Sequence, residues 1–178
     1  MPESKGRKAL IDNFSRPIRY LRLAVTDRCN LRCFYCMPAE GIDYVNRAEL
    51  LTYEEMIRLV QILSPAGVSK IRITGGEPFV RKDLVGFLDR LLKIESVERL
   101  SITTNGILTR PFIPDLKRLG IDNINLSLDT FDPERYRMIT RRDEFSSIRE
   151  TFFELLDNDF KIKINCVVMD GINDVDII

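Results

Sequence analysis

Three cysteines within eight residues are the strongest chemical signal in this sequence. They stand at Cys29, Cys33 and Cys36 with the spacing C-x3-C-x2-C, directly after an alternating apolar run. Thiolates are soft ligands that favour zinc and iron–sulfur clusters. Structural zinc almost always has four protein ligands, whereas an iron–sulfur cube held by three thiolates leaves one iron open for another ligand. The spacing therefore favours an iron–sulfur cluster, with three thiolates that converge on one point.

A zinc site is the alternative that the triplet leaves open. The chain has one further cysteine, Cys166, and no histidine, so zinc would need Cys166 or an acidic residue as its fourth ligand. A disulfide framework is disfavoured, because one thiol of the triplet would be left over and four cysteines without a pairing pattern are typical of a reducing compartment. Colour separates the two metal hypotheses, since iron–sulfur protein is brown and zinc protein is colourless.

The triplet must be positioned by the strand that precedes it. Apolar and polar residues alternate over residues 18–25, which predicts a strand ending at the cysteine loop. Similar signals predict four more strands, and the predicted set covers residues 18–25, 68–74, 99–104, 123–128 and 161–168. Between them, a capping box at Thr52 and Glu55 predicts the start of a helix that Pro65 and Gly67 close. The other predicted helices pass through residues 84–92, 111–119 and 133–158.

Strands that alternate with helices at this spacing indicate an α/β fold with a parallel sheet. Residues 1–15 show no periodicity and are predicted to be a flexible N-terminal arm, so residues 16–178 form the single predicted domain. The second predicted strand ends in Gly75-Gly76-Glu77-Pro78, on the edge where parallel sheets bind ligands. Glycines there would let a ligand approach the backbone closely.

Each predicted strand carries polar residues on one side and apolar residues on the other. Strands buried on both faces read as continuous apolar runs, so the alternation predicts a sheet whose polar face lines a solvated cavity. Arg22, Arg72 and Lys163 outnumber the one conspicuous carboxylate on this face, Asp129, which suits an anionic ligand. The apolar positions predicted to pack on the helices are Leu23, Ile73, Ile102, Leu126 and Ile164.

Composition excludes several partners. The 178 residues include 27 basic and 27 acidic side chains, which argues against nonspecific binding to nucleic acid or to an anionic membrane. No apolar stretch approaches the roughly 20 residues of a membrane span, and the N-terminus lacks the apolar segment of a signal peptide. We therefore expect a cytoplasmic protein without a nucleic-acid or membrane partner.

At the cysteine loop the sequence resembles the radical S-adenosylmethionine (SAM) enzymes. An aromatic residue, Tyr35, precedes the last cysteine, as in that signature. The residues on either side of the triplet resemble more specifically the GTP 3',8-cyclase family of molybdenum cofactor biosynthesis. This resemblance covers the chain from about residue 13. The matching segments are residues 17–23, 26–29, 36–38, 71–78, 103–106, 125–129 and 171–173.

The resemblance implies cofactors, a substrate and site residues. Cys29, Cys33 and Cys36 would ligate a 4Fe-4S cluster whose open iron chelates SAM. The implied SAM contacts are Tyr35, Gly76 and Ser127, and the implied GTP contacts are Arg22, Arg72, Thr103 and Lys163. A 5'-deoxyadenosyl radical would abstract the ribose 3' hydrogen of GTP, giving (8S)-3',8-cyclo-7,8-dihydroguanosine 5'-triphosphate. No side chain is implied as an acid or base, and an electron donor protein is required.

The family's barrel has six strands and a C-terminal extension with a second three-cysteine cluster. This chain has no cysteine after Cys166 and no sixth strand. We therefore expect a partial (β/α)6 TIM-like barrel, truncated after about the fifth strand, that does not convert GTP by itself. Its open edge at residues 161–168 predicts self-association as a homo-oligomer. Two alternatives remain: a radical SAM enzyme of the peptide- or haem-pathway type, and a non-catalytic metal-stabilised fragment.

Overall fold

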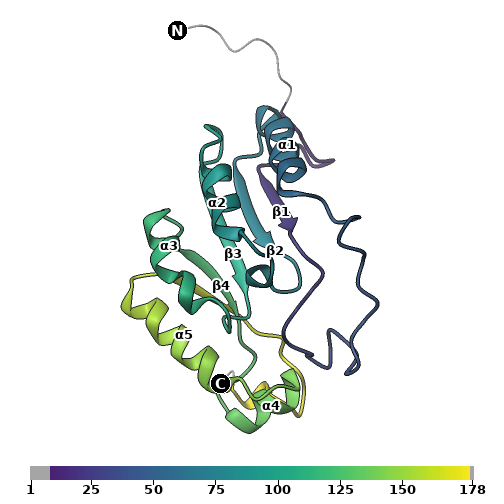
Figure 1. Cartoon of the computed structure of the whole chain (residues 1–178), viewed down its shortest axis with the longest axis vertical. Helices are drawn as coiled ribbons and strands as arrows, with labels where there is room; N and C mark the ends of the chain where they lie inside the picture. Colours follow the sequence, from purple (N-terminus) through teal and green to yellow (C-terminus); the bar gives the residue numbers. More distant parts are fainter. Residues whose placement is uncertain (1–8, 177–178) are drawn as a thin grey trace, which may run out of the picture.

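A single parallel sheet forms the centre of the computed structural model, which describes residues 9–176 (Figure 1). Five strands lie in it in the order β1-β2-β3-β4-β5, and every neighbouring pair is parallel. The strands are β1 Tyr20–Ala24, β2 Lys70–Thr74, β3 Arg99–Thr104, β4 Asn123–Ser127 and β5 Lys161–Asn165. Sequential order and parallel pairing confirm the predicted α/β class, because each connection must cross back over the sheet.

Helices make these crossovers. The α-helices are α1 Tyr53–Leu63, α2 Leu84–Leu92, α3 Ile113–Arg118, α4 Pro133–Thr140 and α5 Phe145–Asp157. Short 3-10 helices add η1 Ser64–Ala66, η2 Pro78–Val80, η3 Arg110–Phe112 and η4 Asp174–Asp176. Among the described residues, no helix combines the length and the apolar character that a membrane crossing needs.

The predicted capping box at the start of α1 is present. The Thr52 hydroxyl accepts the Glu55 N–H, and the Glu55 carboxylate accepts the Thr52 N–H. At the other end Gly67 adopts a left-handed conformation with φ of 107°, where a side chain would be strained. The predicted helix near residues 111–119 divides into η3 and α3. Four of the five strands are shorter than predicted, because the hydrogen-bonded ladder spans fewer residues than the alternating pattern.

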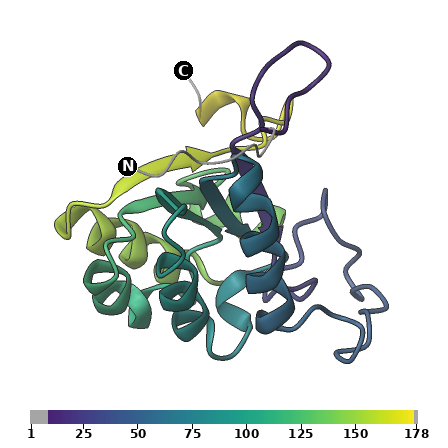
Figure 2. The ribbon, with the colours of Figure 1, turned by 90° about the horizontal axis from the view of Figure 1, so that it is seen from above.

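The helices α1, α2, α3 and α5 cover one face of the sheet and leave the other face without a helical layer (Figure 2). On the covered face Leu23, Ile73, Ile102 and Leu126 are buried as predicted. The prediction for Ile164 is wrong, since this side chain is 39% exposed. It belongs to the edge strand β5, of which only Ile162 is reached by the core clusters.

The first described residues pack against the rest of the domain. Ile11 and Pro17 form an antiparallel bridge, and the Ile18 N–H donates to the Leu10 carbonyl at 2.8 Å. The Leu10 N–H in turn donates to the Ala66 carbonyl at 2.8 Å. Residues 1–8 of the predicted flexible arm lie outside the described residues, so the domain boundary at residue 16 stays a prediction.

Candidate functional site

The cysteine loop, residues 29–37, is held at its base by the end of β2. Beyond the strands the backbone pairing of β1 and β2 continues, because the Gly76 N–H donates to the Thr26 carbonyl at 2.8 Å. The Glu77 N–H donates to the Arg28 carbonyl, also at 2.8 Å. These bonds fix the backbone immediately before Cys29, so the cysteine loop starts from a defined position.

The two glycines at the end of β2 are required by this close approach. A Cβ on Gly75 would lie 2.3 Å from the Thr26 carbonyl oxygen, and a Cβ on Gly76 would lie 2.3 Å from the Arg28 carbonyl oxygen. Neither distance is compatible with a side chain. The chain's own backbone, rather than a ligand, therefore explains why these residues are glycine. With its N–H already bonded, Gly76 has its carbonyl left for a ligand.

The C-terminal end of α4 clamps the other side of the cysteine loop. The Arg32 N–H donates to the Thr140 carbonyl and the Phe34 N–H to the Ile139 carbonyl, both at 3.0 Å. Arg141 donates from its guanidinium to the Met37 carbonyl at 3.1 Å. Carbonyls in the last turn of a helix lack intrahelical partners, so the loop satisfies groups that α4 cannot satisfy itself.

None of the loop cysteines is in a disulfide; Cys29 and Cys33 are partly buried and Cys36 is exposed. In residues 9–176, no three Cys, His, Asp or Glu side chains lie close enough together to hold one metal ion. The convergence of the three thiolates on one point stays a prediction. A 4Fe-4S cube does not require such convergence, since each thiolate binds a different iron. Three free thiols on one short loop are a donor set that fits a cube.

The surroundings of Cys29 and Cys33 favour the protonated form of their thiols. Burial raises the pKa of Cys29, and burial together with the Asp129 carboxylate raises the pKa of Cys33 to about 11. Because iron binds thiolates, loading the loop with iron must release protons. The Cys29 sulfur already accepts hydrogen bonds from the Leu31 N–H at 3.4 Å and from the Asn105 amide at 3.7 Å.

Asp129, at the end of β4, links the cysteine loop to the chain beyond β5. The Tyr35 hydroxyl donates to Asp129 Oδ2 at 2.7 Å, and the Val167 N–H donates to Asp129 Oδ1 at 2.8 Å. The Asn173 amide donates to the Asp129 carbonyl at 2.8 Å. This carboxylate therefore anchors Tyr35 and does not line the basic cavity described next.

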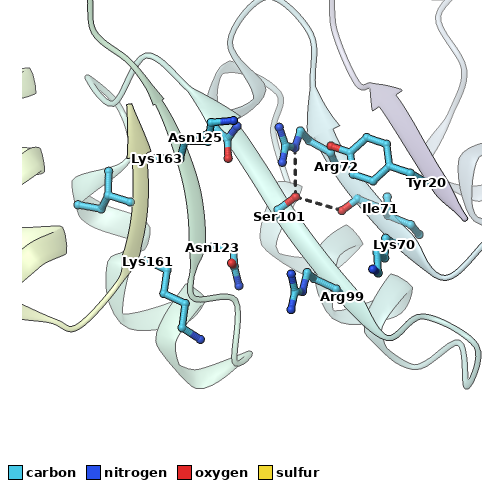
Figure 3. Close-up of a pocket in the computed structure, with 11 residues that line it drawn as sticks. Tyr20, Lys70, Ile71, Arg72, Arg99, Ser101, Asn123, Asn125, Lys161 and Lys163 are labelled. Atoms are coloured by element: carbon cyan, nitrogen blue, oxygen red, sulfur yellow. Dashed lines mark hydrogen bonds between the residues drawn. The ribbon is translucent and has the colours of Figure 1, made fainter. Parts of the chain in front are cut away.

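A cavity of about 290 Å³ lies on the polar face of the sheet (Figure 3). It is lined from all five strands, and none of its lining residues is acidic. Its basic lining residues are Lys70, Arg72, Arg99, Lys161 and Lys163. Such a cluster of cations in a concave surface attracts an anion.

Polar side chains between the cations complete the cavity, which we call the basic cavity. Arg72 donates from Nε to the Ser101 hydroxyl at 3.3 Å, and its guanidinium lies 5.4 Å from the centre of the Tyr20 ring. Asn125 is 5% exposed, and its amide nitrogen has no hydrogen-bond partner among the described residues. A buried donor without a partner is costly, so Asn125 fits a ligand that offers an acceptor.

The structure separates the predicted GTP contacts. Arg72 and Lys163 both line the basic cavity. Arg22 is paired in register with Arg72 but lines a second cleft, of about 660 Å³, together with Gly76. Thr103 is half-buried and is paired in register with Asn125.

Of the predicted SAM contacts, Tyr35 and Gly76 are exposed, and Ser127 is half-buried at the end of β4, paired with Asn165. Ser127 follows Asn125 at the two-residue period of a strand and precedes Asp129 by the same step. The polar face thus continues from the basic cavity to the residue that binds Tyr35.

Sequence reasoning missed three cations of the basic cavity, Lys70, Arg99 and Lys161. Each stands two residues before a polar position that was identified on the same face, namely Arg72, Ser101 and Lys163. The period-2 signal could have found them, because side chains two residues apart in a strand share a face.

Glu77 belongs to the Gly75-Gly76-Glu77-Pro78 motif, and the sequence alone predicts no role for its side chain. Its side chain is fully buried and accepts three hydrogen bonds: from the Asn105 N–H at 2.7 Å, the Thr104 hydroxyl at 2.8 Å and the Phe79 N–H at 3.2 Å. Burial outweighs these donors and raises the pKa of Glu77 to about 7. No local pattern in the sequence signals this network, since it depends on the contact between β2 and β3.

A family model for the radical SAM superfamily matches residues 23–178, so the chain belongs to this superfamily. The predicted family is thereby confirmed. A 4Fe-4S cluster and SAM characterise the superfamily and are the cofactors of this chain.

Among curated proteins, the GTP 3',8-cyclase of Petrotoga mobilis is 46% identical over 166 residues, covering 93% of this chain and 51% of that protein. The mitochondrial GTP 3',8-cyclase of Arabidopsis thaliana is 43% identical over 169 residues, covering 94% of this chain and 43% of that protein. The chain spans about half the length of the curated relatives it matches.

Among solved structures, SuiB of Streptococcus suis matches with a TM-score of 0.70 at 20% identity, over 89% of this chain and 36% of that one. This similarity concerns the fold and confirms the partial TIM-like barrel.

Proposed function

We propose that the chain is the part of a GTP 3',8-cyclase that holds the first cluster, SAM and the substrate phosphates. Cys29, Cys33 and Cys36 would ligate the 4Fe-4S cluster, since they are the only cysteines on the loop clamped by β2 and α4. The proposed SAM contacts are Tyr35, Gly76 and Ser127. The names of the curated relatives support GTP as the substrate.

The basic cavity is the observation that carries the substrate proposal. Of the five cations, Lys161 is already paired with the Asp122 carboxylate at 2.5 Å, which leaves four for a ligand. A nucleoside triphosphate brings several negative charges and many acceptor oxygens, which suit these four cations and the unpartnered amide of Asn125. Guanidinium groups bind phosphate oxygens in pairs, and lysine adds point charges. Arg72 and Lys163 would therefore bind phosphate from inside the cavity. Arg22 and Thr103, one on β1 and one on β3, would contact GTP from the remainder of the polar face.

When bound, the cofactors supply a 5'-deoxyadenosyl radical through reductive cleavage of SAM. This radical would abstract the 3' hydrogen of the GTP ribose, and the resulting C3' radical would attack guanine C8. The chain's own residues bind and orient. The basic cavity holds the charged end of the substrate, while the polar face leads through Ser127 and Asp129 to the cysteine loop. No acid or base side chain is assigned. An electron donor protein and a cytoplasmic location belong to the same proposal.

Binding of GTP to alanine variants tests the substrate assignment. Each charged hydrogen bond to phosphate contributes roughly 1.5–3 kcal/mol, so we expect Arg72→Ala and Lys163→Ala to weaken GTP binding about tenfold or more. Isothermal titration calorimetry under anaerobic conditions measures the affinity. Arg58→Ala is the matched control, because Arg58 is an exposed cation on α1 outside the cavity. If both cavity variants bind GTP as tightly as the control, the basic cavity is not the phosphate site.

Iron content tests the ligand assignment independently of GTP. Anaerobic reconstitution of the chain should give about four iron atoms per chain. Cys33→Ala should lower this content severely, whereas Cys166→Ala should keep it, because Cys166 lies outside the cysteine loop. Equal iron content in the two variants would contradict the assignment.

A further inference from the structure

Asn105 lies at the end of β3, 76 residues from Cys29, yet its side chain meets the cysteine loop. We propose that Asn105 is a positioning residue: its amide holds the Cys29 sulfur, and Glu77 holds Asn105 in place. The inference rests on the proposed assignment of Cys29 as a cluster ligand.

The orientation of the amide is determined by its own oxygen. Asn105 Oδ1 accepts the Ile107 N–H at 3.1 Å, so the oxygen end is turned into the β3–α3 connection. The nitrogen end therefore faces the cysteine loop, where it donates to Asn30 Oδ1 at 2.8 Å and to the Cys29 sulfur at 3.7 Å. A flipped amide would lose the bonds to Ile107 and Asn30, because its nitrogen would face the Ile107 N–H and its oxygen would face Asn30 Oδ1.

The buried Glu77 carboxylate anchors the backbone of Asn105. Its N–H donates to Glu77 Oε2 at 2.7 Å, while Glu77 Oε1 accepts from Thr104 and Phe79. Glu77 is fully buried and Asn105 is 8% exposed, so water does not replace these bonds easily. Gly76, next to Glu77, is bonded to the base of the same cysteine loop. A continuous set of hydrogen bonds thus connects the ends of β2 and β3 with Cys29.

A hydrogen bond to a cluster thiolate has an electronic effect besides a positional one. N–H donors to the sulfurs of an iron–sulfur cluster stabilise the additional negative charge of the reduced state and so raise its reduction potential. Cys29 has two such donors, the Leu31 N–H and the Asn105 amide. Only the Asn105 donor is a side chain, so it can be removed by substitution without changing the backbone of the loop.

The test is a redox titration of the reconstituted chain, with Asn105→Leu as the main variant. Leucine has the same branched shape and the same number of side-chain heavy atoms, but no donor. We expect the ratio of reduced to oxidised cluster at a fixed potential to fall about tenfold, which corresponds to 59 mV for one electron. Asn105→Asp is the second variant; it retains the acceptor for Ile107 and loses the donor, so its potential should also fall.

Thr109→Val is the matched control. Thr109 is fully buried in the same connection and its hydroxyl bonds to Thr104, but it does not reach the cysteine loop. The Thr109→Val substitution should destabilise the fold about as much as Asn105→Leu does, and it should leave the reduction potential of the cluster unchanged. If Asn105→Leu and Asn105→Asp have the potential of the Thr109→Val control, the proposal is wrong.

A second measurement does not need the cluster. In the iron-free chain, we expect iodoacetamide to modify Cys29 about threefold more slowly in Asn105→Leu than in the parent, because the thiolate is the form that reacts and it loses an N–H donor that stabilises its charge. The exposed Cys36 should react at the parent rate, as mass spectrometry of the modified chain can show. Unchanged rates at Cys29 would overturn the positioning role. If Cys29→Ala retains the full iron content, the ligand assignment fails instead, which distinguishes the two ideas.

Discussion

At the residue scale, Glu77 is a carboxyl group whose ionisation is opposed by its surroundings. Its pKa rises from 4.5 to about 7 on folding, because burial removes the carboxylate from water. The folded chain therefore binds a proton more tightly than the unfolded chain. Stability from this group is complete below the unfolded pKa of 4.5 and is lost as the pH rises through about 7.

Glu77→Gln should abolish this pH dependence. The shift of about 2.5 pH units corresponds to roughly 3 kcal/mol of unfolding free energy. As the pH rises from 4.5 to 8, the parent should therefore lose about that much unfolding free energy relative to Glu77→Gln. Urea denaturation at several pH values measures it. A difference that is constant with pH would contradict the raised pKa.

Two glycines give opposite predictions. Gly76→Ala places a Cβ 2.3 Å from a backbone oxygen, so the end of β2 must move away from the base of the cysteine loop. We expect a loss of at least about 2 kcal/mol and poor iron retention. Gly86, inside α2, has nothing within 4 Å of an added Cβ. Gly86→Ala should therefore stabilise the chain by about 0.5–1 kcal/mol.

Denaturation and iron analysis of the two glycine variants check both statements. The comparison is well matched, because the substitution is the same and only the surroundings differ. Equal stabilities of Gly76→Ala and Gly86→Ala would show that the close approach at Gly76 is absent in solution.

At the element scale, the eight-residue helix α4 matters because its last carbonyls hold the cysteine loop. Its start is capped by Asp132, whose carboxylate accepts the Arg135 N–H at 2.7 Å, and by Pro133 in the first turn. The capping box at Thr52 does the same for α1, which does not bond to the loop. The two helices thus have comparable N-terminal caps, but only α4 bonds to the cysteine loop.

Asp132→Ala and Thr52→Ala should each cost about 1 kcal/mol of stability. Only Asp132→Ala should accelerate the loss of iron to a chelator, because fraying of so short a helix reaches the residues that bind Arg32 and Phe34. The rate of bleaching after addition of the chelator measures this effect. Equal rates in the two variants would mean that α4 does not support the cluster.

At the scale of the whole molecule, the sheet has a strand edge at β5. In the described part of the chain β5 pairs with β4 alone, and Ile164, Val167 and Val168 are exposed nearby. Exposed edges of this kind are templates for association between chains. The self-association expected from the sequence stays a prediction.

Val168→Lys should weaken this association, because a charge next to the edge opposes pairing with a second copy. Sedimentation velocity over a range of concentrations measures it. Ile62→Lys is the control, since Ile62 is also an exposed aliphatic residue but lies on α1. A parent chain that stays monomeric at every concentration would refute the prediction.

Local patterns alone determined much of this protein. The cysteine spacing, the capping box at Thr52 and Glu55, and the alternation in each strand depend on residues within a few positions of one another. Their consequences could be predicted because helix and strand periods are properties of the backbone. The parallel α/β sheet and the superfamily followed from them.

The tertiary structure alone decided which distant residues meet. The two-residue period places Lys70, Arg99 and Lys161 on the polar face, but only the register of the five strands brings them into one cavity. The contact of β2 with β3 places Glu77 beneath Asn105 and Asn105 beside Cys29. The tertiary structure also leaves Ile164 exposed at an edge. These outcomes depend on packing between elements far apart in the chain, and no local period encodes such contacts.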